Sequence, residues 1–330
     1  MERHLTAPGV RIRGLTVVYN TPSGELPAVS GVDLTLAPGT ITGVVGESGS
    51  GKSTLALSML NAVQPPGRIS AGSVEIDGLG DVVRLRGEEL RRTRGRKVGY
   101  VFQAAQNSLN PLKTIGAQLL DLGRSHDVGD LRALVRDARE LLGRMGMDGA
   151  RVLDSRQHEL SGGMRQRVGI MFALVLDARV VVLDEPTTAL DMITQATILR
   201  IIREVHDERA LTTLVITHDV GAVAEVADDL AVMYGGRVVE HGPVAEVLGA
   251  PEHPYTRGLI RAIPACPETS AWRGRCPDAR PRWARCPPRA ACSASAARAA
   301  WTCAAPPSRS PPPAPGARSP AISPARTRCR

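Results

Sequence analysis

One glycine-rich loop constrains the fold of this chain more than any other feature of its sequence. It reads Gly46-Glu47-Ser48-Gly49-Ser50-Gly51-Lys52-Ser53 and follows Ile41–Val45, a short run that is apolar on both faces. Such a run is typical of a buried strand in a parallel sheet. Glycines at these spacings let backbone N–H groups curl around a phosphate, and the following helix directs its positive N-terminus at the same group.

We therefore predict a nucleotide site in which this loop and the adjoining Thr54 contact phosphate oxygens. Lys52 would reach the β- and γ-phosphates, and the Ser53 hydroxyl would ligate Mg²⁺. The competing interpretation is a chance turn rich in glycine and serine. The preceding buried strand argues against it, because the motif requires a strand, a loop and a helix in that order.

A second buried run, Val180–Leu183, ends in the acidic pair Asp184 and Glu185. The strand would bring Asp184 to the edge of the phosphate site, where it can hold Mg²⁺ through water. Glu185 lies one residue further, placed to orient and deprotonate an attacking water. In isolation, the pair also fits a strand that ends in a solvated acidic turn. The glycine loop upstream favours the catalytic interpretation.

The remaining pattern predicts strands that alternate with helices, which is typical of a parallel α/β core. We expect strands at Val10–Arg13, Leu15–Tyr19, Val32–Leu36 and Thr213–Ile216, and helices at Leu131–Leu142, Ser161–Leu176 and Ile193–His206. A charged, mainly helical insert near residues 112–160 separates the first buried strand from the later ones.

The composition changes abruptly near residue 265. Residues 265–330 contain 17 Ala, 13 Pro and 12 Arg, only two acidic residues, and all six Cys and three Trp of the chain. A segment with so few large apolar side chains has little to bury, so we predict that it is disordered. Residues 1–264 carry 29 basic and 31 acidic side chains, so the overall charge of +8 is no sign of nucleic-acid binding by this part.

The same composition excludes two other classes of protein. Residues 1–264 contain no Cys, so they do not form a disulfide scaffold. The longest apolar stretch, Val168–Leu183, is interrupted by Asp177 and Arg179. A membrane-spanning helix needs about 20 apolar residues, so we expect none here.

A third motif, Leu160-Ser161-Gly162-Gly163-Met164-Arg165-Gln166-Arg167, places a Ser-Gly-Gly turn at the start of a helix. Ser161 would cap this helix, whose N-terminus would be a second anion-binding point. By itself the motif reads as an ordinary helix cap after a loop. Together with the glycine loop and the acidic strand, it resembles the signature sequence of ATP-binding cassette (ABC) ATPases.

This resemblance implies a fold for the chain. The expected fold is the α/β P-loop NTPase fold of ABC ATPases, which has a parallel-sheet RecA-like core, an antiparallel β subdomain and a helical subdomain. The nucleotide-binding domain would span residues 1–264, with the helical subdomain at about 104–165. That subdomain would dock on a membrane permease, although a plain solvated helical face is the alternative.

The resemblance also implies further site residues. Gln103 is similar to the Q-loop glutamine, which contacts Mg²⁺ and the attacking water, and His218 to the switch histidine, which contacts the γ-phosphate. Asp191 lies in a segment similar to the D-loop. Tyr19 stands where the family places an aromatic ring under adenine. With Glu185, the catalytic residues would be Gln103 and His218.

In the family, the signature turn of one subunit completes the nucleotide site of another. This chain has one glycine loop and one signature, so Ser161, Gly162 and Gly163 would contact ATP held by a second ABC ATPase subunit, identical or different. ATP would close the pair and hydrolysis would let it part, so the γ-phosphate would shift an open–closed equilibrium.

Several stretches look like ATPase subunits of dipeptide and oligopeptide importers, among them Asn107–Pro111, Val239–Pro243 and Pro251–Leu259 with its His-Pro-Tyr-Thr sequence. The resemblance implies Mg-dependent ATP hydrolysis that powers import through partner permease subunits. An extracytoplasmic solute-binding protein would be an indirect partner. The chain would lie at the cytoplasmic face of the cell membrane as a peripheral subunit. An importer of nickel or another small solute is the alternative, since its ATPases share these features.

Two other function classes are less well supported. A soluble ABC ATPase that acts on ribosomes or DNA usually has two cassettes in one chain or long coiled-coil insertions, and this sequence has neither. A basic nucleic-acid-binding module is contradicted by the charge of residues 1–264 and by the lack of interleaved aromatic and basic residues. We therefore expect no nucleic-acid partner.

The chain departs from the family pattern in three places, of which Ala178, where a Pro is common before the strand at Val180–Leu183, is the least. Ala104-Ala105 follow Gln103 where an Asp-Pro or Glu-Pro pair is usual. The family tail carries cysteines, in some members an iron–sulfur ligand set, but the residues around the six Cys here do not match it. The codons of Ala300-Trp301-Thr302-Cys303, read one base earlier, permit the Met-Asp-x-Cys sequence common in that tail. We hypothesise a frameshift shortly after Pro264, which reading the other frames of the gene would test.

Overall fold

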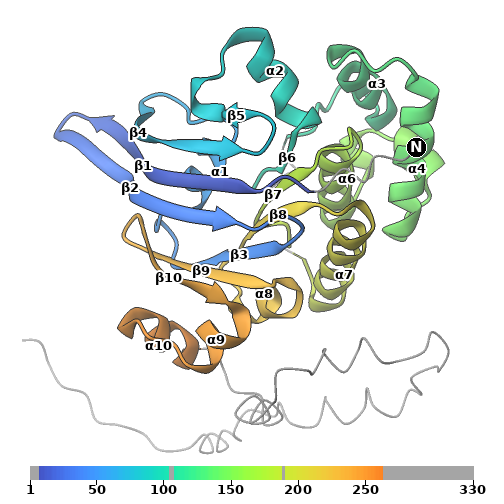
Figure 1. Cartoon of the computed structure of the whole chain (residues 1–330). Coiled ribbons are helices and arrows are strands. Elements are labelled where there is room, and N and C mark those ends of the chain that lie inside the picture. The colour runs from blue at the N-terminus through green and yellow to red at the C-terminus, as the bar shows by residue number, and fades with distance from the viewer. Residues whose placement is uncertain (1–6, 104–107, 188–189, 263–330) are drawn as a thin grey trace, which may run out of the picture. The chain divides into compact units, whose positions relative to one another are not determined.

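The computed structural model describes residues 7–103, 108–187 and 190–262. These residues include a central six-stranded sheet, with helices and a second sheet packed around it (Figure 1). These residues all belong to one unit, Met1–Cys276, of the two into which contacts divide the chain. The strand order is β10 (Arg237–Pro243), β9 (Asp229–Tyr234), β3 (Ile41–Val45), β8 (Thr212–Ile216), β7 (Val180–Asp184) and β6 (Val98–Val101). All neighbours are parallel except β10, which pairs antiparallel with β9 at one edge. The parallel α/β core predicted from the sequence is confirmed.

A second, antiparallel sheet contains β2 (Gly24–Leu36), β1 (Val10–Thr21), β4 (Gly67–Ile76) and β5 (Gly80–Asp81) in that order. The prediction of two separate strands within residues 10–19 is wrong, because β1 runs through both. Its register shifts between Ile12 and Leu15, where Gly14 has a φ of +55°. Such a bulge interrupts the apolar–polar alternation without ending the strand.

Ten α-helices and two short 3₁₀-helices occur within the described ranges. They are α1 (Lys52–Ser58), α2 (Gly87–Arg96), α3 (Ile115–Ser125), α4 (Leu131–Arg144), α5 (Gly149–Asp154), α6 (Gly162–Leu174), α7 (Met192–Arg209), α8 (Val220–Val226), α9 (Val244–Gly249), α10 (Pro254–Arg261), η1 (Val82–Arg84) and η3 (Gln157–Glu159). The three predicted helices correspond to α4, α6 and α7. Ser161 caps α6 as expected, because its Oγ accepts the N–H of Met164.

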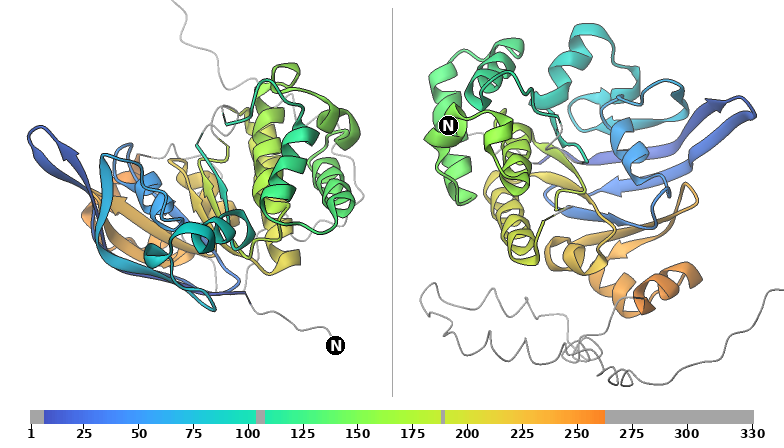
Figure 2. Two further views of the ribbon diagram at one scale, coloured as in Figure 1. Left: turned by 90° about the horizontal axis from the view of Figure 1, so that it is seen from above. Right: turned by 180° about the vertical axis from the view of Figure 1, so that it is seen from behind.

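Two apolar cores lie on opposite faces of the central sheet. Along β7, Val180 and Val182 belong to the core shared with α1 and the antiparallel sheet, whereas Val181 and Leu183 belong to the core shared with α6 and α7. Figure 2 shows the antiparallel sheet, in blue, and the green helices on opposite sides of the central strands. Burial on both faces explains why these strands are continuous apolar runs in the sequence.

The carboxyl ends of β6, β7 and β8 are neighbours in parallel register, so the segments that follow them start side by side. None of the helices in the described ranges is both long and apolar enough to cross a membrane. The predicted tail at 265–330 and the pair Ala104-Ala105 lie outside the described residues.

Candidate nucleotide site

The loop between β3 and α1 requires glycine at two positions. Gly46 has a φ of +153° and Gly51 a φ of +99°, a conformation that residues with side chains rarely adopt. A Cβ on Gly46 would collide with the carbonyl oxygen of Met233, and a Cβ on Gly51 with that of Ala28. The loop therefore packs backbone against backbone on β9 and β2.

Lys52 is almost fully buried and points back into this loop. Its Nζ donates hydrogen bonds to the carbonyl oxygens of Gly46 and Glu47, at 2.8 and 2.7 Å. Burial lowers the pKa of Lys52, although three carboxylates, among them that of Glu185, oppose the shift. A phosphate group at this loop would give the buried ammonium a direct counter-charge.

Ser53 near the start of α1 and Asp184 at the end of β7 are joined by a hydrogen bond. Ser53 Oγ donates to Oδ1 of Asp184, and the Tyr100 hydroxyl donates to Oδ2, both at 3.1 Å. Asp184 is 3% exposed; burial raises its pKa, and the two hydrogen bonds oppose the rise. The glycine-rich loop, residues 46–53, is called the phosphate loop from here on. A hydroxyl and a carboxylate beside such a loop are the oxygen donors that Mg²⁺ uses in nucleotide sites. The residues present fit such an ion.

These two side chains are few for a metal site. The described residues hold no group of three or more His, Cys, Asp or Glu side chains that could bind a metal by themselves. Gln103, predicted as a further magnesium ligand, donates through Nε2 to Glu185, and the ligand role of its amide oxygen stays a prediction. A divalent ion between Ser53 and Asp184 would thus need phosphate oxygens or water among its other ligands.

Glu185 turns out of the sheet with a φ of +50°, which is unusual for a residue with a side chain. Its N–H donates to the carbonyl oxygen of Ile216 at 2.9 Å, which fixes the turn to the end of β8. Gln103 Nε2 donates to Oε2 of Glu185 at 3.1 Å, and His218 Nδ1 lies 3.4 Å from Oε1. The loops after β6, β7 and β8 thus bring all three predicted catalytic residues together at one carboxylate.

The signature turn, residues 161–163, is not bonded to the phosphate loop of its own chain. Within the described ranges, residues 161–163 make no hydrogen bond or ion pair with residues 46–54. Ser161 Oγ accepts the N–H of Met164 at 3.3 Å, and Ser161 itself is exposed. Its backbone and side chain therefore face solvent at the start of α6, where another molecule can reach them.

Two other predicted residues also have no hydrogen bond or ion pair with the loop in the described ranges. Asp191 caps α7, accepting the N–H and the hydroxyl of Thr194 at 2.9 and 2.6 Å, and these hydrogen bonds lower the pKa of Asp191. Tyr19 is half-buried on β1 with its ring against Gly67, where a Cβ would lie 2.7 Å from the ring. Neither has a polar contact with residues 46–54 in the part of the chain that the structure describes. Residues 188–189 of the predicted D-loop lie outside that part.

Sequence reasoning missed three residues that contact the site. The first is Tyr100, the donor to the Asp184 carboxylate. The second is Gln166 of α6, whose buried Nε2 donates to the carbonyl oxygen of Pro186 at 2.9 Å. The third is Tyr255 of α10, whose hydroxyl lies at the phosphate loop. Gln166 and Tyr255 stand in motifs that indicate the family, but no spacing in the sequence points to these contacts.

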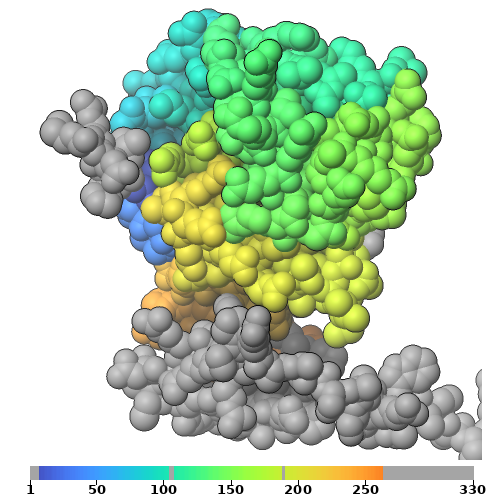
Figure 3. Space-filling view, turned by 90° about the vertical axis from the view of Figure 1, so that its right-hand side faces the viewer, coloured from blue at the N-terminus to red at the C-terminus, as the bar shows by residue number. Residues whose placement is uncertain are grey.

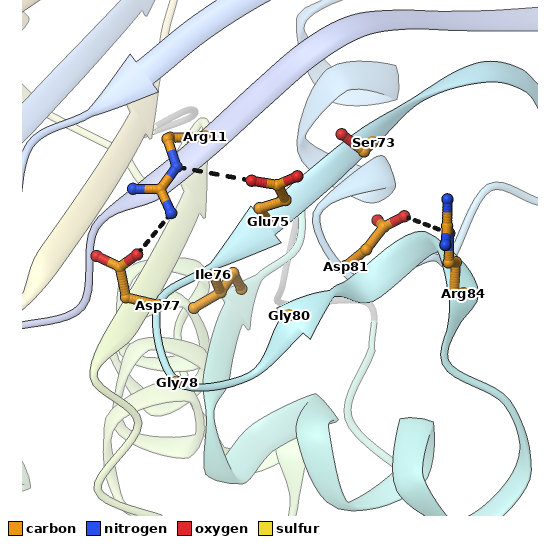
Figure 4. Close-up of a pocket in the computed structure, with 9 residues that line it drawn as sticks. All are labelled: Arg11, Ser73, Glu75, Ile76, Asp77, Gly78, Gly80, Asp81 and Arg84. Atoms are coloured by element: carbon orange, nitrogen blue, oxygen red, sulfur yellow. Dashed lines mark hydrogen bonds and ion pairs between the residues drawn. The ribbon is translucent and has the colours of Figure 1, made fainter.

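A hollow of about 400 Å³ lies on the antiparallel sheet (Figure 4). It is lined by Arg11, Ser73, Glu75, Ile76, Asp77, Gly78, Gly80, Asp81 and Arg84, none of which is a predicted site residue. Arg11 lies 2.9 Å from Asp77, and Arg84 lies 3.2 Å from Asp81. The lining charges thus pair with one another and give no indication of a ligand site.

Comparison with known proteins gives two family matches. The model described as "ABC transporter" matches residues 29–188, and "Oligopeptide/dipeptide transporter, C-terminal region" matches residues 239–295. A protein of Brucella melitensis biotype 1, named as a peptide import ATP-binding protein, is 42% identical over 274 residues, or 81% of each chain. A relative with the same kind of name from Brucella abortus is 43% identical over 260 residues, or 78% of each chain.

Solved structures give a consistent result. The dimeric structure of a bacterial ABC transporter cassette matches with a TM-score of 0.63 and 27% identity, covering 71% of this chain and 98% of that chain. A dimeric post-hydrolysis state of the cassette, bound to ADP and Pi, matches with a TM-score of 0.62 and 29% identity over the same shares. The fold predicted from the sequence is confirmed by these likenesses.

Proposed function

The chain belongs to the ABC transporter family, and on that premise we propose that it is the ATP-hydrolysing subunit of a dipeptide or oligopeptide importer. The matched C-terminal region and the names of the Brucella relatives support peptides as the solute class. The observation that supports the ATPase role most directly is that Gln103 and His218 both contact the carboxylate of Glu185.

The phosphate loop and Lys52 bind the triphosphate in this proposal. Lys52 exchanges its two carbonyl acceptors for β- and γ-phosphate oxygens, which replaces neutral partners with charged ones. Ser53 and Asp184 would hold Mg²⁺, which would neutralise charge on the phosphate oxygens when bound. Tyr19 supports the adenine ring from β1.

Glu185 is the general base. Its carboxylate accepts a proton from water as the water oxygen bonds to the γ-phosphorus and the bond to the β–γ bridging oxygen breaks. Gln103 and His218 contact one carboxylate oxygen each, so they fix the direction from which the proton is accepted. ADP and phosphate are the products.

A second ABC ATPase subunit, identical or different, completes each site. The support within this chain is that residues 161–163 are exposed or half-buried at the start of α6 and have no polar contact with its own residues 46–54. Ser161, Gly162 and Gly163 would bind the γ-phosphate held by the partner, as an N-terminal anion site. Asp191, at the start of α7, would lie at the same interface.

A membrane permease docks on the helical face made by α3, α4 and α5. Figure 3 shows this face, with the green helical segment above the yellow segment that contains α7. Leu112, three residues before α3 in the sequence, is 83% exposed, and Phe102, just after β6, is 49% exposed. The choice of this face rests on the family analogy. The chain would thereby lie at the cytoplasmic face of the membrane.

Coexpression with candidate permease subunits tests the proposal. We expect the chain to copurify with them and to hydrolyse ATP only when Mg²⁺ is present, with Lys52→Ala as the inactive control. In proteoliposomes with a solute-binding protein, peptide uptake should require ATP and intact Lys52. Uptake of nickel without uptake of peptides would show that nickel is the solute and peptides are not. Copurification with ribosomes or DNA in place of a permease would overturn the proposal.

A further inference from the structure

One aromatic side chain joins the carboxyl-terminal helix α10 to the phosphate loop. The hydroxyl of Tyr255 accepts a hydrogen bond from the backbone N–H of Glu47 at 3.1 Å, although the two residues are 208 positions apart. The Tyr255 ring packs on that of Tyr234, the last residue of β9, with 4.4 Å between ring centroids. The two rings limit the positions that the Tyr255 hydroxyl can take.

The hydrogen bond holds one side of a peptide unit whose other side is held by Lys52. This unit joins Gly46 to Glu47: its N–H donates to Tyr255, and its carbonyl oxygen accepts from Lys52 Nζ at 2.8 Å. The N–H and C=O of a trans peptide point in opposite directions. Rotation of this peptide would therefore break both contacts, and the two together fix the start of the loop.

The backbone around the peptide unit restricts it further. Gly46 lies so close to the carbonyl oxygen of Met233 in β9 that a Cβ would not fit between them. The N–H of Gly236, in the turn after β9, donates to the carbonyl oxygen of Ser50 at 3.1 Å. The segment from β9 onward thus supports the loop at its start and at its middle.

The helix that carries Tyr255 is itself anchored. Glu240 of β10 accepts the backbone N–H groups of Glu252 and His253, at 2.8 and 3.1 Å. Burial alone would raise the pKa of Glu240, but the hydrogen bonds that it accepts lower it, so the carboxylate is charged. His253 Nδ1 accepts the N–H of Tyr255 at 3.1 Å, which caps α10 at its first turn.

We propose that Tyr255 is a positioning residue for the phosphate loop, through which α10 sets the affinity of the site for nucleotide. The proposal rests on the proposed function of that loop in nucleotide binding. Tyr255 does not touch reacting atoms; it acts through the Gly46–Glu47 peptide on Lys52. Its hydroxyl lowers the cost of holding the loop in one conformation before the nucleotide arrives.

The test compares Tyr255→Phe with Tyr234→Phe in the full chain. Tyr255→Phe keeps the ring pair and removes the hydroxyl that accepts from Glu47. Tyr234→Phe removes the other hydroxyl of the pair, which has no hydrogen bond to any residue in the described ranges. Each variant is titrated with ADP and with MgATP, and its amide hydrogen exchange in residues 46–53 is measured without nucleotide.

For Tyr255→Phe we expect nucleotide binding that is about threefold to tenfold weaker, the effect of one hydrogen bond. The KM for MgATP should rise by the same factor while kcat stays within about twofold of wild type, and exchange at Glu47 should be faster. Tyr234→Phe should match wild type in affinity and exchange. Part of the Tyr255→Phe effect should persist in a Glu47→Ala background, because the donor to the hydroxyl oxygen is a backbone N–H, although the Glu47 carboxylate also interacts with the hydroxyl.

Three results would count against these expectations. Wild-type affinity and exchange in Tyr255→Phe would overturn the positioning role while leaving the nucleotide site intact. Equal weakening by Tyr234→Phe would assign the effect to ring packing and would also overturn it. Failure of the wild-type chain to bind either nucleotide would refute the proposed function itself.

Discussion

The Tyr100 hydroxyl donates a hydrogen bond to Oδ2 of Asp184 at 3.1 Å, so a tyrosine of β6 holds the carboxylate at the end of β7. Burial raises the pKa of Tyr100, and the hydroxyl therefore keeps its proton and remains a donor. Burial also raises the pKa of Asp184, against the hydrogen bonds from Ser53 and Tyr100. Tyr100 thus favours the charged form of the Asp184 carboxylate and holds its other oxygen toward Ser53.

Tyr100→Phe should therefore weaken the response of the ATPase to Mg²⁺. We expect the Mg²⁺ concentration for half-maximal hydrolysis to rise about tenfold, as is typical when the partner of a metal-binding side chain is removed. The ring contact with Phe102, 4.5 Å between centroids, is kept in this variant, so its melting temperature should change little. An unchanged Mg²⁺ titration would show that Tyr100 has no such role.

Glu185→Gln should separate nucleotide binding from hydrolysis. The amide keeps the shape of the side chain but cannot accept a proton from water, so turnover should fall about 10²- to 10⁴-fold. Binding of MgATP, measured by titration, should stay close to wild type because Glu185 does not belong to the phosphate loop. Turnover equal to that of the wild type would refute Glu185 as the base.

Gly46→Ala should destabilise the fold and abolish nucleotide binding. The added Cβ meets the Met233 carbonyl oxygen at a φ of +153°, so the free energy of unfolding should fall by roughly 2–4 kcal/mol. Gly24→Ala is the matched control, since Gly24 has a φ of +121° with open space around it. Backbone strain alone should cost this control about 1 kcal/mol. Equal losses in urea unfolding would contradict the steric explanation.

His206 should make the fold sensitive to acid. Its Nε2 donates to the Gly39 carbonyl oxygen at 3.2 Å, and its Nδ1 accepts from the Thr213 hydroxyl at 2.9 Å. Burial lowers the pKa of His206 below its ordinary value of 6.5. The unfolded chain then binds the proton more readily, so the contribution to stability is complete above that value and is lost as the pH falls below it.

Urea unfolding of wild type and His206→Gln at about pH 7.5 and about pH 5.5 measures this contribution. We expect the wild type to lose more free energy of unfolding than the variant between the two values, because other titrating groups act equally on both. Parallel losses would mean that His206 does not drive the acid sensitivity.

Strands that are buried on both faces were the elements best predicted from the sequence. The predicted range Ile41–Val45 is β3 itself, and Val180–Leu183 and Thr213–Ile216 each lack one residue of β7 and β8. Their continuous apolar character has no other simple explanation in so short a run. β10 is the opposite case: its residues, such as Arg237 and Glu240, are exposed or half-buried, and the strand exists because it pairs with β9.

The site residues also divide into those that a local motif predicts and those that only a long-range contact reveals. The phosphate loop and the acidic strand were predicted because their chemistry is local: each motif carries its own charges and turns. Tyr100 and Tyr255 were missed because their contacts join residues 84 and 208 positions apart. The sequence around Tyr100 does not differ from that of a tyrosine packed in a core, and the His-Pro-Tyr-Thr sequence around Tyr255 indicates the family but not the contact. Such contacts become visible only when the strand order is known.

The alternation of Val180, Val181, Val182 and Leu183 between two cores has a further consequence, because the same strand ends in Asp184. Inserting or deleting one residue in β7 would exchange the occupants of both cores and turn this carboxylate away from Ser53 in the same event. The hydrogen bond between Ser53 and Asp184 thus depends on the apolar layers on either side of the strand. We therefore expect that insertion or deletion of a single residue in β7 disrupts both cores and the carboxylate, whichever residue is inserted.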